Sequence, residues 1–397
     1  MALYHQLISD EEMKALESEF ISWRREIHEN PCLSRHEEDT ASRIAGYLES
    51  FGVEHEVILD GTSVVGIVRG GKPGPTVALR ADIDALPIAE CTGLPYASKN
   101  EGIMHACGHD VHATVLLGAA KVLSMKADEL SGNVKFFFQP SEEKMGGAER
   151  MIAAGVLENP HVDYVVGLHL DPFHPAGTVG IKYDIMYSAS DETEFVFHGK
   201  GAHGAHPEHG IDAIAIAAQA ITNVQMVVSR IITPLTPSVC TFGTIEGGQV
   251  INQIADRVKV TGILRSLNHE TRIKLRETVT NIMVKTAEMY GATCDVTIRE
   301  GYGMLKNHRA TTEKVEQSAR DVLGDAGVYV EEEPEMGCED FSYFVNERPG
   351  CFFHLGCAGD DPESVYELHN SHFRPNEDCI LTGVKVQVNN VLTLLGI

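Results

Sequence analysis

Residues 105–125 read HACGHDVHATVLLGAAKVLSM, and residues 134–143 read VKFFFQPSEE. The apolar stretch from Val111 to Met125 predicts a buried helix, and the run Val134–Phe138 predicts a strand with both faces covered. Each segment meets chemically active side chains: His, Cys and Asp stand before the helix, and two Glu follow the strand. This arrangement is typical of an α/β fold that carries a site at the ends of its strands.

The same alternation continues on both sides of this stretch. Residues 12–53 form a helical region that Pro31 breaks. Apolar strands that alternate with helices indicate a largely parallel sheet covered on both faces. The other expected strands are 64–68, 76–80, 164–168, 328–332 and 351–355, and the other expected helices are 147–157, 312–323, 340–345 and 378–395.

The pattern changes between Tyr187 and about Tyr302. Strands are expected at 192–198, 238–246, 256–264 and 294–299, with helices at 212–230 and 270–290. The resulting order, β-α-β-β-α-β, is that of a ferredoxin-like domain. We therefore expect an inserted domain at 187–302 and a discontinuous main domain at 1–186 and 303–397.

Composition excludes several classes of partner. The chain has 397 residues, which suggests two or three domains, and 43% of them are hydrophobic, enough for a large core. The formal net charge of −25 argues against nucleic acid and against an anionic membrane surface, since both need a basic footprint. No segment approaches the ~20 uninterrupted apolar residues of a membrane span.

The cysteines and the N-terminus indicate a cytoplasmic protein. The nine cysteines are scattered and odd in number, as expected of reduced thiols. The start of the sequence, MALYHQLISDEEMKALESEF, has no basic segment followed by an apolar core, so no secretory signal is predicted.

The cluster around Cys107 is the first candidate site. Cys107 and His109 lie two residues apart at a loop-to-helix junction, within a stretch that also holds His105, Asp110 and His112. Thiolate and imidazole are good ligands for zinc-like ions. The alternative is a loop whose Asp caps the helix.

Glu142 and Glu143 form the second candidate site, at the end of the strand VKFFF. A metal-dependent hydrolase needs one carboxylate to hold the metal and another to take a proton from water, and neighbouring acids can divide these roles. The alternative is an acid-rich helix N-terminus, which the helix dipole favours.

Three more segments add possible ligands. His169 ends the strand YVVGL, although a structural role is more common for such a His. Asp82 and Asp84 follow the strand TVALR and could bind a metal or orient the second nitrogen of a ligating His. His369 lies in the polar stretch LHNSH and could equally be an exposed loop residue.

The inserted domain contributes a second set. His203 lies in GKGAHGAHP, where glycines let the backbone approach a ligand closely, although a solvated hairpin loop is an equal alternative. Asn252 and Arg265 belong to the same domain. Arg265 could bind a substrate carboxylate with two hydrogen bonds, or it could be an ordinary surface charge.

These segments, in this order, resemble the M20 metallopeptidase family, and most closely its amidohydrolase subfamily of N-acyl-amino-acid, hippurate and auxin-conjugate hydrolases. The resemblance extends from about Trp23 to Gly383. The matching stretches are WRREIHENP, ALRADIDALPI, MHACGHDVHATVLLGAA, FFFQPSEEKMGGAERMI, VVGLHLDP, GKGAHGAHPEHGIDAI, CEDFSYF, PGCFFHLG and the His369 loop.

The resemblance implies a catalytic α/β domain with two divalent metal ions and an inserted lid that often dimerises. It implies Glu142 as general base, Asp84 as a carboxylate supporting the ligands, and His203 as a residue that helps to stabilise the oxyanion, often from the partner subunit. Asn252 and Arg265 match lid positions near the substrate. The implied metal ligands are Cys107, His109, Glu143, His169 and His369.

From these observations we expect metal-assisted hydrolysis of the amide bond in an N-acyl amino acid, by a homodimer or higher homo-oligomer. The thiolate favours zinc, and the carboxylate and imidazole ligands also admit manganese, cobalt or nickel. A dipeptidase or carboxypeptidase on the same scaffold is the alternative enzyme. A metal-free binding or scaffold protein is the alternative of another class.

Overall fold

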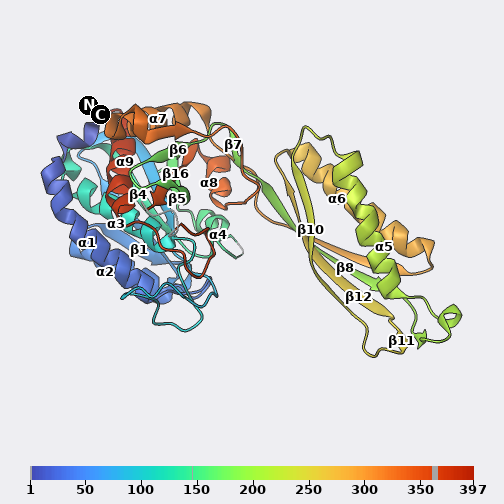
Figure 1. The fold of residues 1–397 in the computed structure, drawn as a ribbon. Coiled ribbons are helices and arrows are strands. Elements are labelled where there is room, and N and C mark those ends of the chain that lie inside the picture. Colours follow the sequence, from blue (N-terminus) through green and yellow to red (C-terminus); the bar gives the residue numbers. More distant parts are fainter. Residues whose placement is uncertain (1, 145, 360–364) are drawn as a thin grey trace. The chain divides into compact units, whose positions relative to one another are not determined.

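The computed structural model describes residues 2–144, 146–359 and 365–397 (Figure 1). The chain forms two compact units. The first consists of Met1–Asp184, Lys306–Glu333 and Asp340–Ile397. The second consists of Ile185–Leu305 together with the short segment Pro334–Glu339. The first unit is therefore built from three separate stretches of chain.

An eight-stranded sheet forms the centre of the first unit, in the order β1-β2-β4-β3-β5-β16-β6-β15. The inner strands β4, β3, β5 and β16 run parallel to one another. Strands β1 and β2 pair antiparallel with their neighbours, and β6 pairs antiparallel with β16 but parallel with β15. The unit is thus an α/β fold with a mostly parallel central sheet. Its strands are β1 (Glu54–Ile58), β2 (Ser63–Arg69), β3 (Lys72–Asp82), β4 (Ser131–Gln139), β5 (Tyr164–Pro175), β6 (Val179–Ile181), β15 (Val328–Val330) and β16 (Gly350–Ala358).

Helices surround this sheet, and the first of them begins at a side-chain cap. Ser9 and Glu12 form a reciprocal capping box at the start of the first helix, and Pro31 separates that helix from the second. The helices are α1 (Asp10–Glu29), α2 (Glu38–Ser50), α3 (His109–Ser124), α4 (Gly147–Ala153), α7 (Arg309–Leu323), α8 (Phe341–Glu347) and α9 (Asp378–Leu395).

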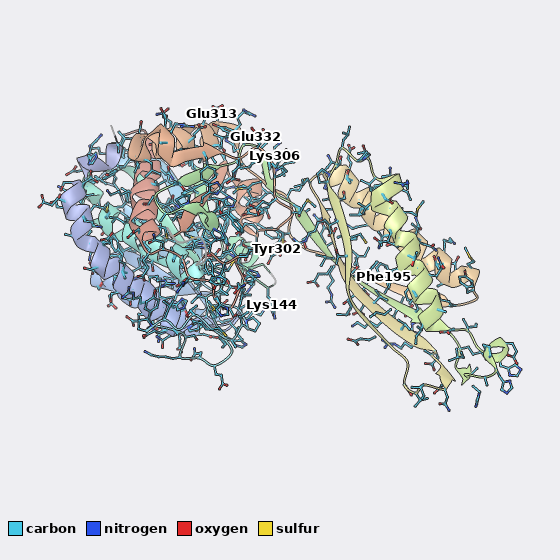
Figure 2. All side chains as sticks on the ribbon, in the orientation of Figure 1. Lys144, Phe195, Tyr302, Lys306, Glu313 and Glu332 are labelled. Carbon is cyan, nitrogen blue, oxygen red and sulfur yellow. The ribbon has the colours of Figure 1, made fainter. Side chains whose placement is uncertain are left out.

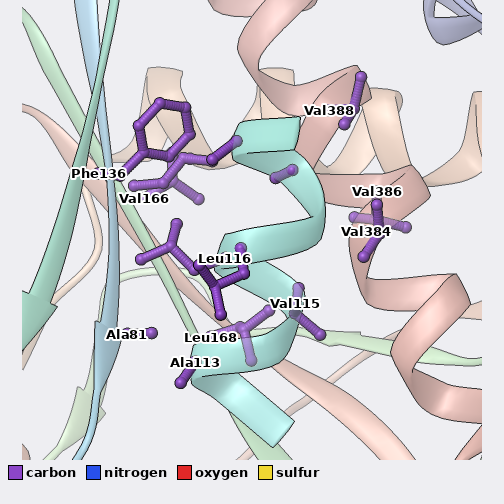
Figure 3. Close-up of a cluster of buried hydrophobic side chains, with 14 of the residues drawn as sticks. Ala81, Ala113, Val115, Leu116, Phe136, Val166, Leu168, Val384, Val386 and Val388 are labelled. Carbon is purple, nitrogen blue, oxygen red and sulfur yellow. The ribbon is translucent and has the colours of Figure 1, made fainter. Parts of the chain in front are cut away.

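Helix α3 is the centre of the hydrophobic core. Figure 3 shows it between the strands of the sheet and α9. Phe136 of β4 and Leu168 of β5 lie on its sheet side, and Val384 and Val388 of α9 lie on the other. Because α3 is apolar on all sides, it is buried along its whole length. The buried helix holds its N-terminus, which carries Cys107 and His109, in a fixed place above the sheet.

The second unit contains a four-stranded antiparallel sheet in the order β10-β12-β8-β13. Helices α5 and α6 pack on this sheet around a second core that includes Phe195, labelled in Figure 2. Two short strands, β9 (Ala202–His203) and β11 (Gln253–Ile254), pair separately. The main elements, in chain order, are β8 (Ala189–His198), α5 (Ala213–Met226), β10 (Ser238–Gly247), β12 (Arg257–Ser266), α6 (His269–Met289) and β13 (Thr293–Glu300).

Two strands of the first unit have no counterpart among the sequence predictions. Strand β1 has the sequence EHEVI and is mostly exposed, so it lacks the apolar run that identifies a buried strand. Strand β6 contains three residues, too few for a periodic pattern. Helix α4 ends at Ala153, earlier than the predicted Leu157. The exposed strand β1 and the short strand β6 were therefore missed, whereas the longer apolar strands were predicted.

The stretch Ala213–Ile231, which contains α5, is the one described helix whose length and composition would allow it to cross a membrane. One side of α5 packs into the core of the second unit, and Gln219 and Asn223 hydrogen-bond to each other on the helix. Only 28% of the stretch is buried. Its outer side therefore exposes an apolar surface, with Met226 53% exposed.

Replacing Phe136 by Ala should lower the free energy of unfolding by about 3–5 kcal/mol, because it leaves a cavity against α3. Denaturant unfolding followed by circular dichroism would measure the change. The control is Phe173→Ala, since Phe173 is 65% exposed and its loss should cost less than about 0.5 kcal/mol. Equal losses in the two variants would contradict the assigned core.

Candidate metal centre

The parallel strands β3, β4 and β5 bring the candidate residues to one edge of the sheet. Strand β3 leads to Asp82 and Asp84, β4 leads to the Glu142–Glu143 pair, and β5 carries His169. These strands are neighbours in the order β4-β3-β5, and their carboxyl ends point the same way. The sheet topology therefore gathers residues that lie up to 87 positions apart in the sequence.

The N-terminus of α3 places Cys107 and His109 over this edge. Gly108, between them, has a φ of +85°, and a Cβ atom there would lie 2.5 Å from the side chain of Leu170. Only glycine tolerates both the left-handed backbone and this close approach. Gly108 thus allows the Cys and the His to face the end of β5 together.

Four of the five proposed ligands meet at short distances. The Cys107 Sγ lies 3.3 Å from His169 Nε2 and 3.3 Å from His369 Nε2. His369 Nε2 lies 3.1 Å from Glu143 Oε1. The fifth, His109, places its Nε2 3.9 Å from the same Glu143 oxygen. His369, 262 residues away from Cys107, therefore lies with these donor atoms, although its side chain is 52% exposed.

The donor atoms form two groups that share Cys107. One contains His109 and His169, and the other contains Glu143 and His369. Two atoms bound to one tetrahedral ion at about 2.0–2.3 Å lie roughly 3.3–3.8 Å apart, close to the separations found around the Cys107 sulfur. Two groups that share Cys107 fit a pair of divalent metal ions, which the five proposed ligands would hold.

Hydrogen bonds on the far ring nitrogens prepare two histidines as ligands. His109 Nδ1 lies 2.9 Å from the carbonyl oxygen of Asp84, and His169 Nδ1 lies 2.9 Å from that of Leu170. A carbonyl only accepts, so each Nδ1 carries the proton and each Nε2 presents a lone pair when the ring is neutral. Within the described part of the chain, the buried His109 Nε2 has no hydrogen-bond partner, which fits a nitrogen meant for a metal ion.

The site is strongly negative, as a cation-binding site should be. Burial by itself would lower the pKa of His109, but Asp82, Asp84 and Glu143 outweigh it and raise this pKa to about 10. Burial and the nearby carboxylates, Glu143 foremost, raise the pKa of the Cys107 thiol well above its ordinary value. A divalent cation would relieve both effects by replacing the protons.

Asp84 supports the ligands instead of joining them. One carboxylate oxygen accepts the backbone N–H of Glu142 at 3.2 Å, and the other accepts that of Glu143 at 3.1 Å. The Ser34 hydroxyl donates to the same carboxylate at 2.7 Å. Asp84 also contacts His109 through its own Oδ1, at 3.2 Å. One buried carboxylate thus fixes both the metal-binding histidine and the pair of glutamates.

Asp82 binds a different partner. Its Oδ1 lies 2.6 Å from His112 Nδ1, and its Oδ2 accepts from Arg80 at 2.7 Å. His112 Nε2 in turn accepts the backbone N–H of Leu170 at 3.0 Å, next to His169. Arg80 also binds Asp340 at 2.7 Å. The sequence did not predict roles for Arg80 or Asp340, although an Arg inside a buried strand is a signal that a buried acid lies near.

The remaining members of the His-rich stretch point away from the metal ligands. Asp110 forms an ion pair with Arg24 and a hydrogen bond with His28, both of α1, in a buried network. Burial lowers the pKa of His105 to about 4, so its ring is neutral. Of the five candidate side chains before and within the start of α3, Cys107 and His109 are the two that lie with the other proposed ligands, while His112 forms a further donor group with Asp82 and His109.

A further cluster, Asp171, Glu331 and His354, has different geometry. His354 Nδ1 lies 2.6 Å from Glu331 Oε1, and the Tyr329 hydroxyl donates to Asp171 at 2.8 Å. His174 also hydrogen-bonds to Asp171 and stacks on Tyr329. These are hydrogen-bond distances, shorter than the separations around Cys107. The cluster is a network of side-chain hydrogen bonds.

Glu142 is buried with 8% of its surface exposed and stands directly beside the ligand Glu143. Its backbone is held by Asp84, as described above. Lys144, labelled in Figure 2, follows the pair and is exposed. The two adjacent glutamates differ in burial, since Glu142 is buried and Glu143 only partly so, and both lie within reach of His109.

The second unit contains the other three predicted residues. His203 and Asn252 lie together, because β9 pairs with β11 and the Gly204 N–H donates to the Asn252 carbonyl at 2.7 Å. Arg265 lies near the far end of β12, paired with Ser190 of β8. The structure thus brings two of the three residues together and separates the third from them.

Comparison with known proteins agrees with this geometry. Residues 78–392 match Peptidase family M20/M25/M40. The chain belongs to this family. It is 39% identical to thermostable carboxypeptidase 2 of Saccharolobus solfataricus, over 96% of both chains. It is 38% identical to the N-acetyl-L-cysteine deacetylase of Bacillus subtilis, over 93% of this chain and 86% of that one.

A solved M20 structure extends the likeness to the fold. The Bacillus subtilis YXEP protein, described as a dinuclear metal-binding peptidase, has a TM-score of 0.83 and 31% identity, over 96% of this chain and 99% of that one. The M20 relatives include amidohydrolases, deacetylases and carboxypeptidases. This M20 chain is accordingly a metal-dependent hydrolase whose residues fit two divalent ions.

Metal binding to this M20 protein should release about two protons per chain at pH 7, one from the Cys107 thiol and one from His109. Both groups hold their protons at neutral pH without metal, so the metal affinity should rise as pH rises and fall as pH falls. Calorimetric titration of metal-free protein with Zn²⁺, in buffers of different ionisation enthalpy, would count the protons. Cys107→Ser should reduce the count by about one. A binding enthalpy that does not change with the ionisation enthalpy of the buffer would contradict proton release from Cys107 and His109.

Proposed function

We propose that the protein hydrolyses the amide bond of N-acyl amino acids, with Glu142 as the general base. The observation that carries this proposal is the placement of Glu142 beside the ligand Glu143, with both backbone amides bound by Asp84. The proposed ligands are Cys107, His109, Glu143, His169 and His369. An amide substrate also agrees with the names of the deacetylase and carboxypeptidase relatives.

In this proposal Glu142 performs both proton transfers. Its carboxylate takes a proton from the attacking water, and the resulting carboxylic acid later gives that proton to the nitrogen of the leaving amine. Burial keeps other water molecules away from the carboxyl group. When bound, two divalent ions supply Lewis acidity that acidifies water and polarises a carbonyl.

We propose zinc or manganese as the metal. A thiolate and imidazoles favour zinc, and carboxylates admit manganese; cobalt and nickel suit the same donors.

His203 has the right tautomer to stabilise an oxyanion. The backbone N–H of Ala205 donates to His203 Nδ1 at 3.1 Å, so Nδ1 is an acceptor and the proton lies on Nε2. A neutral imidazole with a proton on Nε2 is a hydrogen-bond donor to developing negative charge. We propose Asn252 and Arg265 as the substrate-binding residues, with Arg265 binding the substrate carboxylate.

The separation of His203 and Arg265 within the second unit supports a proposal that two chains contribute to one site. Strand β8 ends at His198, five residues before His203, and His198 pairs with Arg257 at the start of β12. Arg265 lies eight residues further along β12. At the usual rise of about 3.3 Å per residue this is about 26 Å, longer than an N-acyl amino acid. One small substrate therefore cannot touch both His203 and Arg265 of the same chain. We propose that His203 and Asn252 act on the site of a partner subunit.

The surface of the second unit supports such a homodimer. Strand β10 ends the sheet order, and no described strand pairs with its outer edge. Beside it, α5 and the turn after it expose Met226, Val228 and Ile231. An unpaired edge next to an apolar helix face is suited to symmetric pairing with a second copy. We propose that residues 187–302 form a ferredoxin-like lid and dimerisation domain, and that residues 1–186 and 303–397 form the catalytic domain.

We also propose a cytoplasmic location. All nine cysteines are free, and four of them are buried thiols that need no oxidising compartment.

A substrate panel with Glu142→Gln tests the function. The purified protein with Zn²⁺ or Mn²⁺ should hydrolyse acetyl- and benzoyl-amino acids faster than dipeptides. Glu142→Gln should keep two metal ions per chain and lose about 10²–10⁴-fold in kcat, since Gln cannot take a proton. Glu149→Gln, an identical change at an exposed position of α4, should keep full activity. Faster cleavage of dipeptides would favour a peptidase, and an active Glu142→Gln enzyme would refute the assigned base.

A complementation experiment tests the shared site. Glu142→Gln and His203→Ala homodimers should both be nearly inactive. A heterodimer isolated with two affinity tags should recover about half of the wild-type activity, because one of its two sites has Glu142 from one chain and His203 from the other. His206→Ala, three residues away on the same loop, is the control for His203→Ala. An inactive heterodimer would show that His203 serves its own chain.

A further inference from the structure

The loop that carries Glu142 contains an unfavourable backbone conformation. Ser141 has a φ of +57°, in the left-handed region that costs free energy for any residue with a Cβ atom. The loop then returns so closely that a Cβ on Gly147 would lie 1.6 Å from the carbonyl oxygen of Pro140. Ser141 is therefore the residue at which the chain turns from β4 toward Glu142, and something must hold it there.

Hydrogen bonds to the Glu37 carboxylate keep Ser141 in this conformation. Its Oε1 accepts the backbone N–H of Ser141 at 2.8 Å and the Ser141 hydroxyl at 3.0 Å. The Ser141 hydroxyl oxygen in turn accepts the backbone N–H of Arg35 at 2.9 Å. Glu37 is fully buried and Ser141 almost so. The contacts fix both the backbone and the side chain of Ser141 from a segment 104 residues earlier in the chain.

Capping of α2 does not explain the burial of Glu37. It occupies the N-cap position of α2, yet its side chain makes no capping hydrogen bond to that helix. Its second oxygen, Oε2, has no hydrogen-bond partner among the described residues. A buried carboxylate is costly, so a fold that only needed a helix cap would place a short polar side chain there.

Glu37 also completes a series of three backbone amides bound by carboxylates. The N–H of Ser141 donates to Glu37, and those of Glu142 and Glu143 donate to Asp84. Two buried acids thus bind all three amides of the segment that carries Glu142. Removing the Glu37 carboxylate would leave the Ser141 amide without this acceptor. The three amides would then be held only by the hydrogen bonds that Asp84 accepts.

We propose that Glu37 is a positioning residue for catalysis: it holds Ser141 in the left-handed conformation and thereby aims the Glu142 carboxylate. This inference rests on the proposed role of Glu142 as general base. Glu37 touches neither the substrate nor the proposed ligands, and it acts through Ser141. The Glu37 side chain therefore determines how often Glu142 is in its productive position.

The test compares four variants of the full-length, metal-loaded protein. Glu37→Ala should lower kcat about 100-fold, the scale expected for a misplaced catalytic group, while KM changes less than about threefold and two metal ions stay bound. Glu37→Gln keeps an acceptor oxygen toward Ser141 and should stay within about fivefold of wild type. Glu38→Ala, an exposed neighbour of the same residue type, should be unaffected.

The fourth variant separates positioning from general loss of packing. Glycine adopts φ near +57° without cost, so the kcat of Glu37→Ala/Ser141→Gly should be about 5- to 10-fold higher than that of Glu37→Ala. Loss of packing alone would make the double variant no better than Glu37→Ala. That result, or an unchanged kcat in Glu37→Ala, would overturn the proposal.

Amide hydrogen exchange gives a readout that does not depend on activity. The peptide that spans residues 139–144 should exchange faster in Glu37→Ala than in wild type, and Glu37→Gln should restore its protection. Unchanged exchange would overturn the positioning role even if the wild type proves inactive on every N-acyl amino acid. An inactive wild type with the expected exchange pattern would instead refute the proposed function and leave the Glu37 contact established.

Discussion

The carboxylate of Asp84 accepts hydrogen bonds from three parts of the chain, and the arrangement of the metal centre follows from them. It binds the ring of His109, the backbone amides of the two glutamates and the hydroxyl of Ser34. Because Asp84 is buried, none of these donors can be replaced by bulk water without cost. A single ionised side chain thus couples the start of α3, the end of β4 and the segment after α1.

Charge explains why such a site can exist in the interior. The chain has a net charge of −25, and several of its acids lie buried around the proposed ligands. Arg80 lies between Asp82 and Asp340 and compensates part of this charge. The remaining negative charge raises the pKa of Cys107 and of His109, and it favours a bound cation over protons at these side chains. The long-range acidic field disfavours an anionic substrate, so the carboxylate of an N-acyl amino acid needs local positive charge, such as that of Arg265.

The sequence predicted the inner sheet and most of the proposed site because these depend on local patterns. Buried strands such as VKFFF and the apolar helix at 111–125 have unmistakable composition, and the ligands stand at their ends. The exposed strand β1 and the three-residue β6 lack such patterns and were missed. Glu37 was missed for another reason: next to Glu38 and near the start of a helix, it resembles an ordinary solvated acid.

The sequence by itself determined which residue types were available for a site, the order of the main elements and the resemblance to the M20 family. These follow from composition, periodicity and motifs. Only the tertiary structure decided which of several equivalent side chains act together. It grouped Cys107 and His109 with His169, paired Asp110 with Arg24 and His28 instead, and placed Arg265 far from His203. The physical reason is that contacts between residues hundreds of positions apart depend on strand register and on the turn at each strand end, and neither is encoded in a local pattern.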